Sequence, residues 1–199
     1  MKYYPNQIKE GFSLVELIVV IAIIGLLVSV LYASFDESRK QARDKARMTS
    51  LKELQLSIET YRAQYGRYPS RGDCNLPPNQ NNPVTGVNFT GPNHTSNMDT
   101  SSGFLGCAAT RPFIKDLTPS FIGRLPKDRF DDQPNRGFYY RTDDNGTAYK
   151  LMLHDVVETL TVSSFDHDFA RCPRQGGACN AATPPGTTYA VYSPGAEDW

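Results

Sequence analysis

A long apolar run near the N-terminus constrains this chain more than any other feature. No charged residue occurs from Leu17 to Phe35, and one carboxylate, Glu16, immediately precedes the run. These 19 residues would form a helix of about 28 Å, close to the ~30 Å thickness of a bilayer core. An acid beside such a segment is costly, since insertion scales assign about 3 kcal/mol to an Asp at the centre of a membrane helix. We therefore expect a specific partner that compensates Glu16.

The residues around Glu16 form a recognisable signal. A short leader with two lysines is followed by Gly11-Phe-Ser-Leu-Val-Glu16 and the apolar run. This pattern resembles the class III signal of type IV pilins and pseudopilins. The resemblance implies that a prepilin peptidase removes the leader, residues 1–11, by cutting between Gly11 and Phe12, and then methylates the amino group of Phe12. It also implies that Glu16 pairs with the amino terminus of a neighbouring subunit during assembly.

Two simpler explanations of the apolar run account for less. A cleaved secretory signal has a core of only ~7–15 residues and ends at small residues. An ordinary signal anchor, as in a surface enzyme, needs only the apolar run and leaves Glu16 and the Gly11–Phe12 junction unexplained. The signal-anchored enzyme is nevertheless kept as a competing class.

The apolar run continues into an amphipathic helix. No proline lies between Phe12 and Tyr65, and Gly66 and Pro69 are suited to end a helix. Charged residues of this segment are largely free to point away from the apolar face of the helix: Arg47, Lys52, Glu53, Glu59 and Arg62. That face follows steps of three and four residues, as expected for one side of a helix: Leu51, Leu54, Ile58, Tyr61 and Tyr65.

The family resemblance implies an α+β pilin fold, in which one long N-terminal helix packs on a small antiparallel sheet. We expect the helix over residues 12–66, with a membrane-spanning part at about 14–35, and a globular head over 67–199. Gly25 lies within the membrane part, where glycine allows helices to approach closely. Many pilins carry a proline eight residues later, but this chain has Ala33.

The head is predicted to contain a long loop, a turn region and a sheet. Residues 70–111 are rich in Asn, Gly, Pro, Ser and Thr, which is typical of coil. Residues 112–127 are expected to form a short helix or turn that packs into the core. Aromatic and β-branched runs at 137–142 and 147–154 flank Asp143-Asp-Asn-Gly146 and predict a hairpin. With a further strand at 187–193, the sheet would have three or four antiparallel strands.

All four cysteines lie beyond the apolar run, which fits disulfides in an oxidising compartment. Three pairings are possible; the close spacing of Cys172 and Cys179 favours a local bridge, which leaves Cys74 to pair with Cys107. Zinc is the competing hypothesis, but no Cys-x-x-Cys pair is present.

Other candidate sites carry weaker signals. Asn88, Asn93 and Asn145 begin Asn-x-Thr triplets that could carry glycans outside the cell. Three acidic groups could supply oxygen ligands for calcium, which the major pseudopilins of type II secretion bind, although turn and surface roles are the preferred interpretation: Asp131-Asp132, Asp143-Asp144-Asn145 and Glu197-Asp198. No catalytic constellation and no metal site are predicted, so the chain is expected not to be an enzyme and to need no cofactor.

Charge adds two points about partners and orientation. The formal net charge is zero, which does not favour general nucleic-acid binding. Five basic residues at 36–47 would place the C-terminal side in the cytoplasm by the positive-inside rule, whereas the resemblance implies the opposite.

The favoured function is that of a major type IV pilin, with a type II secretion pseudopilin as the alternative. Its expected partners are identical subunits, the prepilin peptidase, and the inner-membrane assembly platform with its ATPase. The chain would reside in the cytoplasmic membrane before assembly and in an extracellular filament afterwards.

Overall fold

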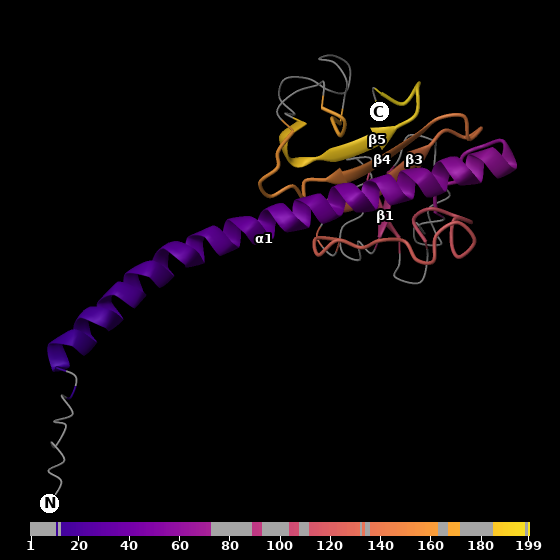
Figure 1. Cartoon of the computed structure of the whole chain (residues 1–199). Helices are drawn as coiled ribbons and strands as arrows, with labels where there is room; N and C mark the ends of the chain where they lie inside the picture. The colour runs from indigo at the N-terminus through magenta and orange to yellow at the C-terminus, as the bar shows by residue number, and fades with distance from the viewer. Residues whose placement is uncertain are drawn as a thin grey trace, which may run out of the picture. The chain divides into compact units, whose positions relative to one another are not determined.

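A computed structural model describes residue 11 and residues 13–72, 89–92, 104–107, 112–131, 133, 136–162, 167–171, 185–197 and 199. It divides into two compact units, Met1–Lys40 and Gln41–Trp199, which are described separately below. The elements, labelled in part in Figure 1, are α1 (Leu14–Tyr65), β1 (Phe89–Pro92), β2 (Phe104–Cys107), β3 (Gly137–Thr142), β4 (Tyr149–His154), η1 (Pro185–Thr187) and β5 (Tyr189–Tyr192).

The long helix predicted from the sequence is confirmed. α1 runs without interruption for 52 residues, Leu14–Tyr65. It ends where glycine permits a left-handed conformation: Gly66 has φ +72°, and its N–H donates to the carbonyl of Arg62 at 2.8 Å.

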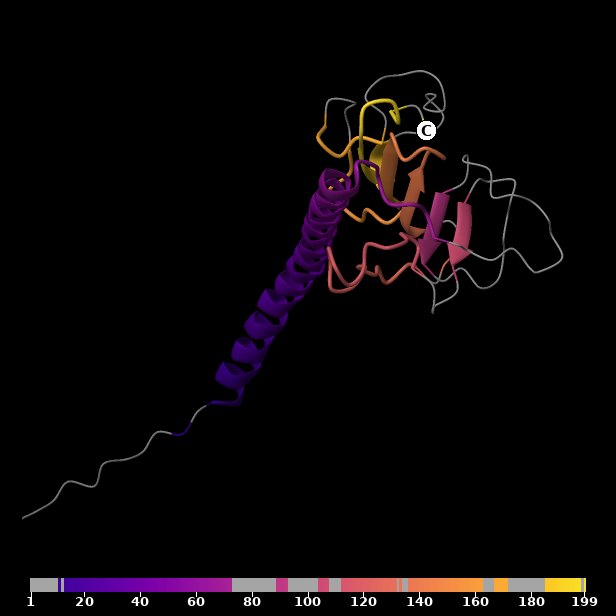
Figure 2. The same ribbon diagram turned by 90° about the vertical axis from the view of Figure 1, so that its right-hand side faces the viewer.

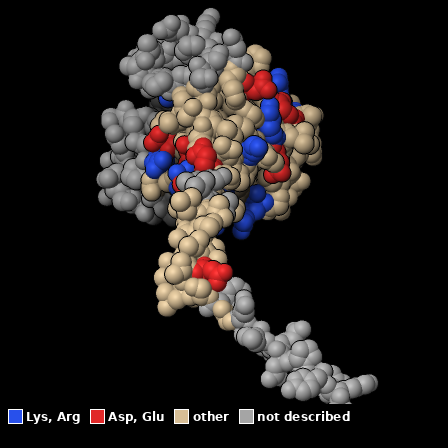
Figure 3. Space-filling model, turned by 60° about the vertical axis from the view of Figure 1, so that its left-hand side comes forward, with Lys and Arg blue, Asp and Glu red and all other residues tan. Residues whose placement is uncertain are grey.

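The first unit contains the apolar part of α1. Large hydrophobic side chains from Leu14 to Val28 are between 43% and 73% exposed, and they lie on all sides of the helix. On the face shown in Figure 3, the described atoms of this unit are almost all uncharged, whereas blue and red atoms are frequent on the second unit. Within the described residues, no helical segment reaches the length and apolar character that a membrane span requires.

The second unit contains a five-stranded sheet in the order β2-β1-β3-β4-β5. Neighbouring strands from β1 to β5 are antiparallel, as predicted, but β2 pairs with β1 in parallel. Figure 2 shows β1 and β2 on one side of this sheet. The segment 70–111 is therefore not entirely coil, as the sequence had suggested.

The two strands that were not predicted, β1 and β2, are short, and side-chain hydrogen bonds help to hold β1 in place. Thr90 of β1 is fully buried, and its hydroxyl donates to the carbonyls of Phe113 and Tyr140 at 2.8 and 3.2 Å. Four-residue strands among Asn, Gly and Pro leave too short a pattern for periodicity to detect.

The main core lies between α1 and one face of the sheet. Leu51, Leu54, Ile58 and Tyr61 are buried as predicted, whereas Tyr65 is 55% exposed. Side chains alternate along each strand, so every second residue faces the helix. The helix-facing set is Phe138, Tyr140, Tyr149, Leu151, Leu153, Tyr189 and Val191. The opposite face carries a smaller cluster of Phe89, Tyr139, Met152 and Ala190.

The hairpin and the region before it match the sequence predictions. β3 and β4 pair in register from Gly137↔His154 to Thr142↔Tyr149, around the predicted turn. Residues 112–127 form turns rather than a helix, and Phe113, Ile114 and Leu117 enter the main core.

Candidate functional site

The start of α1 is closed by reciprocal hydrogen bonds. The N–H of Ser13 donates to Oε2 of Glu16 at 2.9 Å. In return, Oγ of Ser13 accepts the N–H of Val15 at 3.4 Å. Since α1 begins at Leu14, Ser13 is the N-cap and Glu16 the third helical residue, which is the spacing of a capping box.

This arrangement gives Glu16 a role that the sequence analysis missed. The pattern Ser-x-x-Glu before an apolar run is itself a helix-start signal and was available in the sequence. Cleavage is predicted between Gly11 and Phe12. Gly11 is exposed, whereas Phe12 lies outside the described residues. Cleavage, methylation and pairing with a neighbouring subunit therefore stay predictions.

Gly25, the other predicted assembly residue, lies within α1. Apart from the backbone of α1 itself, no described atom lies within 4 Å of a Cβ placed on it, so the described residues leave that surface open. Nothing among the residues that the structure describes requires a glycine at this position.

A second site joins α1 to two loops of the head. We call it the Arg47 cluster: Arg43, Asp44, Arg47, Asp128 and Glu158. The guanidinium of Arg47 donates to Asp128 at 2.6 Å, to Asp44 at 2.8 Å and to Glu158 at 2.8 Å. Its side chain is only 5% exposed, so the expectation that it points away from the core is wrong.

Asp44 fastens a loop of the head directly to α1. Its carboxylate is completely buried and accepts the backbone N–H groups of Glu158, Thr159 and Leu160 at distances of 2.8 to 3.1 Å. Burial alone would raise the pKa of Asp44, but these backbone donors and Arg47 outweigh burial, and the pKa is lowered.

Glu158 is shared among three arginines. Arg43 binds it through two nitrogens, at 2.8 and 2.6 Å, and Arg47 and Arg129 contact it at 2.8 and 3.2 Å. The hydrogen bonds from Arg43 are the largest influence, and with the other two arginines they lower the pKa of Glu158 to about 2.

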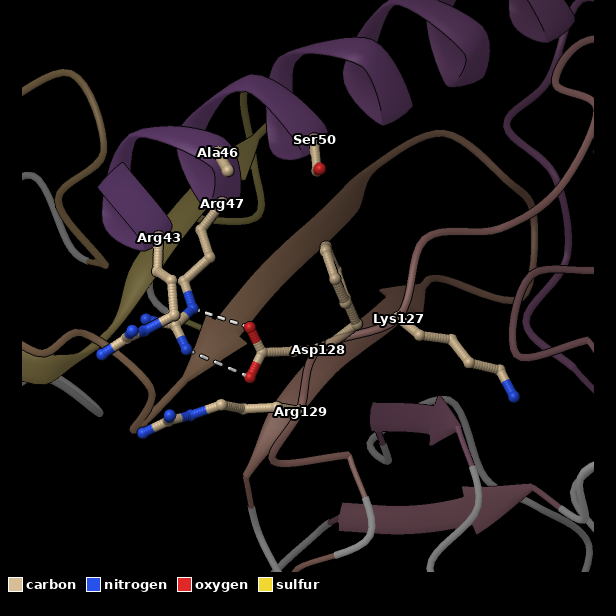
Figure 4. Close-up of a pocket in the computed structure, with 8 residues that line it drawn as sticks. Arg43, Ala46, Arg47, Ser50, Lys127, Asp128 and Arg129 are labelled. Carbon is tan, nitrogen blue, oxygen red and sulfur yellow. Dashed lines mark hydrogen bonds and ion pairs between the residues drawn. The ribbon is translucent and has the colours of Figure 1, made fainter. Parts of the chain in front are cut away.

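The Arg47 cluster borders a pocket of about 180 Å³. Figure 4 shows Arg43, Arg47 and Arg129 extending to the same side of this pocket, whereas Lys127 extends away from them. The arginines that line the pocket already bind carboxylates, so the arrangement fits a structural clamp between α1 and the head.

No described residues form a group suited to hold a metal ion. Among the acids considered for calcium, Asp131 accepts the backbone N–H groups of Asp128 and Phe138 at 2.7 and 3.2 Å. Asp143 similarly accepts the N–H groups of Thr147 and Ala148 at 2.6 and 2.8 Å. These bonds support the turn roles that the sequence analysis preferred.

The cysteines and sequons are described only in part. Cys107 is buried and disulfide-bonded. Cys74, Cys172 and Cys179 lie outside the described residues, so the pairing stays a prediction. Asn88 and Asn93 also lie outside them, whereas Asn145 is exposed in the turn between β3 and β4.

Comparisons with known proteins agree with the signal at the N-terminus. Residues 7–32 match the family described as the prokaryotic N-terminal methylation motif. The chain is 32% identical over 70 residues to a competence protein, ComGC, of Halalkalibacterium halodurans, a match that covers 35% of this chain and 69% of the relative. No solved structure matches the chain.

The motif, the long capped helix and the sheet packed on it define a pilin-like subunit. The chain belongs to the family of type IV pilins and pseudopilins. Proteins of this kind are structural rather than enzymatic.

Proposed function

We propose that this chain is the major subunit of a type IV pilus-like extracellular filament. The observation that carries the proposal is the apolar surface from Leu14 to Val28, which is exposed on every side of α1. A helix that is apolar all round needs apolar surroundings. Lipid would supply them before assembly, and the helices of other copies would supply them in the filament.

Glu16 gives this packing its register. It would pair with the amino terminus of Phe12 on a neighbouring subunit, since an unmatched carboxylate among apolar helices is costly. Gly25 would let neighbouring helices approach closely. The prepilin peptidase, an assembly platform in the inner membrane and its ATPase are the partners that this route requires.

Replacement of Glu16 tests the proposal. Glu16→Ala is expected to leave processed protein in the membrane while abolishing or severely reducing filaments on the cell surface, as observed by electron microscopy. Ser29→Ala serves as a control, because it alters a polar side chain of the same helix without changing its charge. Normal filaments in Glu16→Ala cells would contradict the proposed assembly mechanism.

The second candidate is a pseudopilin, which forms a short filament within a secretion or uptake system. The similarity to the competence protein ComGC favours this alternative, and it suggests DNA uptake as a further property to test. Deletion of the gene should abolish long filaments if the chain is a major pilin. Loss of transformation or of protein secretion, in cells that never display long filaments, would favour the pseudopilin.

A further inference from the structure

Two like charges lie opposite each other on the second face of the sheet, the face opposite the main core. Arg141 of β3 and Lys150 of β4 are paired in register, so their side chains share this face, where opposed like charges destabilise a strand pair. Lys150 is completely buried, and a buried ammonium group is costly unless it is hydrogen-bonded. Burial and, to a lesser extent, Arg71 lower the pKa of Arg141. The pair therefore needs compensation from another part of the chain.

Residues 193–197 and 199, which we call the strap, supply this compensation. Nζ of Lys150 donates to the carbonyls of Glu197 and Trp199, in both cases at 2.9 Å. The guanidinium carbon of Arg141 lies 4.3 Å from the centre of the Trp199 ring. Carbonyl oxygens and the faces of aromatic rings carry partial negative charge, which favours a nearby cation. The strap therefore binds both cations of the pair.

The strap has a defined conformation that brings these groups into place. It leaves β5 at Ser193, whose Oγ accepts the N–H of Tyr149 at 2.9 Å. Two turns follow, in which the N–H of Ala196 donates to the carbonyl of Ser193 at 3.2 Å and the N–H of Trp199 donates to the carbonyl of Ala196 at 3.3 Å. Gly195 has φ +91°, a conformation that favours glycine. Trp199 then packs against the small apolar cluster of this face.

We propose that the strap is a latch, which Lys150 and Arg141 hold closed over the second face of the sheet. Without the ammonium group, the carbonyls of Glu197 and Trp199 lose a charged donor, and an acceptor left unpaired costs free energy. The strap then opens while the hairpin stays intact, because β3 is paired with β4 along all six of its residues. Among the described residues, the main core also includes none of the strap.

Lys150→Met tests the latch, because methionine keeps a long unbranched side chain and removes the ammonium group. Hydrogen exchange of the full chain in detergent, followed by mass spectrometry, compares the strap with the β3–β4 hairpin. We expect about tenfold faster exchange in the strap, the effect of losing a hydrogen bond from a charged donor, and unchanged exchange in the hairpin. Lys127→Met is the matched control, because Lys127 is exposed, and it should change neither segment.

Fluorescence reports the same opening directly. Trp199 is the one tryptophan in the sequence, so the emission of the chain comes from the strap. In Lys150→Met, the emission should move to longer wavelength and acrylamide should quench it more readily, whereas Lys127→Met should match the unmodified chain.

Trp199→Ala tests the contact with Arg141 and changes no residue of the sheet. The readout is acetylation of lysine amines by N-hydroxysuccinimide acetate, located by mass spectrometry. In the unmodified chain, Lys150 should react far more slowly than Lys127. In Trp199→Ala, acetylation of Lys150 should become about fivefold faster, the usual effect of losing a cation–π contact, while Lys127 should react as before.

Three results would overturn the latch. The first is equal exchange of the strap in Lys150→Met and the unmodified chain. The second is a Lys150 that reacts as fast as Lys127 in the unmodified chain. The third is unchanged acetylation of Lys150 in Trp199→Ala, which also decides the matter if Lys150→Met unfolds the hairpin, whereas faster acetylation would then support the latch. None of these measurements depends on leader cleavage or filaments, so each outcome leaves the proposed function to its own test.

Discussion

At the scale of single residues, Arg47 is the cation that three buried carboxylates share. Its guanidinium contacts Asp44, Asp128 and Glu158, and all three carboxylates are largely buried. Replacing it by methionine keeps much of its volume but leaves this acidic surrounding without its central cation. We expect Arg47→Met to lower the free energy of unfolding by about 3–5 kcal/mol, the usual effect of breaking a buried pair.

Denaturant unfolding of the full chain in detergent would measure this change. Lys45→Met is the matched control, since Lys45 lies two residues away on the exposed side of α1 and should change stability by less than about 0.5 kcal/mol. Equal stability of the two variants would contradict the role assigned to Arg47.

The same residues predict how stability depends on pH. The pKa of Glu158 is lowered from 4.5 to about 2 in the folded chain. A lowered folded pKa contributes stability above the unfolded pKa, and this contribution is lost as pH falls from about 4.5 towards 2. After allowance for solvent screening, we expect Glu158 to account for roughly 1–2 kcal/mol of that loss. Unfolding curves at pH 7 and pH 3 should differ less in Glu158→Gln than in the unmodified chain, and an unchanged difference would contradict the prediction.

The sequence could not predict the Arg47 cluster. Arg47 is separated from Asp128 and Glu158 by 81 and 111 residues, and pairs at such separations leave no local pattern. Only the pair with Asp44, three residues earlier on the same helix, was visible in the sequence. The capping box was different, because its Ser-x-x-Glu spacing is local and could have been recognised.

At the scale of elements, the predictions succeeded where a pattern was long or a turn was strongly specified. α1 has 52 residues, of which the first part is an apolar run and the last part shows helical spacing, and its end was marked by Gly66. The hairpin was marked by Asn145 and Gly146 between two apolar strands. β1 and β2 have four residues each. The position of β1 depends on contacts with distant residues such as Phe113 and Tyr140, and β2 pairs with β1.

The hairpin turn also yields a testable prediction. Gly146 has φ +67°, and a Cβ there would lie 3.0 Å from the carbonyl oxygen of Tyr68. Gly146→Ala should therefore destabilise the chain by about 1–3 kcal/mol, through backbone strain and this contact. Gly123→Ala is the control, because no described atom lies within 4 Å of its Cβ position and its φ is not in the left-handed region. Thermal unfolding should separate the two variants, and equal melting temperatures would refute the argument.

At the scale of the whole molecule, the proposed assembly depends on removal of the leader. Before cleavage, the residue that follows Gly11 has an amide and carries no charge, so it cannot neutralise a carboxylate. Cleavage converts that amide into an amine, which is positively charged at neutral pH. Assembly through Glu16 would thus depend on processing through simple electrostatics, and an unprocessed chain would lack the cation that the filament requires.

Gly11→Leu tests this dependence. Apart from Gly11 itself and its chain neighbours, no described atom lies within 4 Å of a Cβ placed at this position, so the substitution should not disturb the fold. We expect the variant to retain its leader, to keep the head folded and to form no filaments. Intact mass and N-terminal sequencing would show the retained residues, and Gly123→Leu would control for the change of side chain. A mature chain that begins at Phe12 in the Gly11→Leu variant would show that cleavage does not depend on this glycine. Filaments built from the uncleaved chain would show that Glu16 does not need the freed amine.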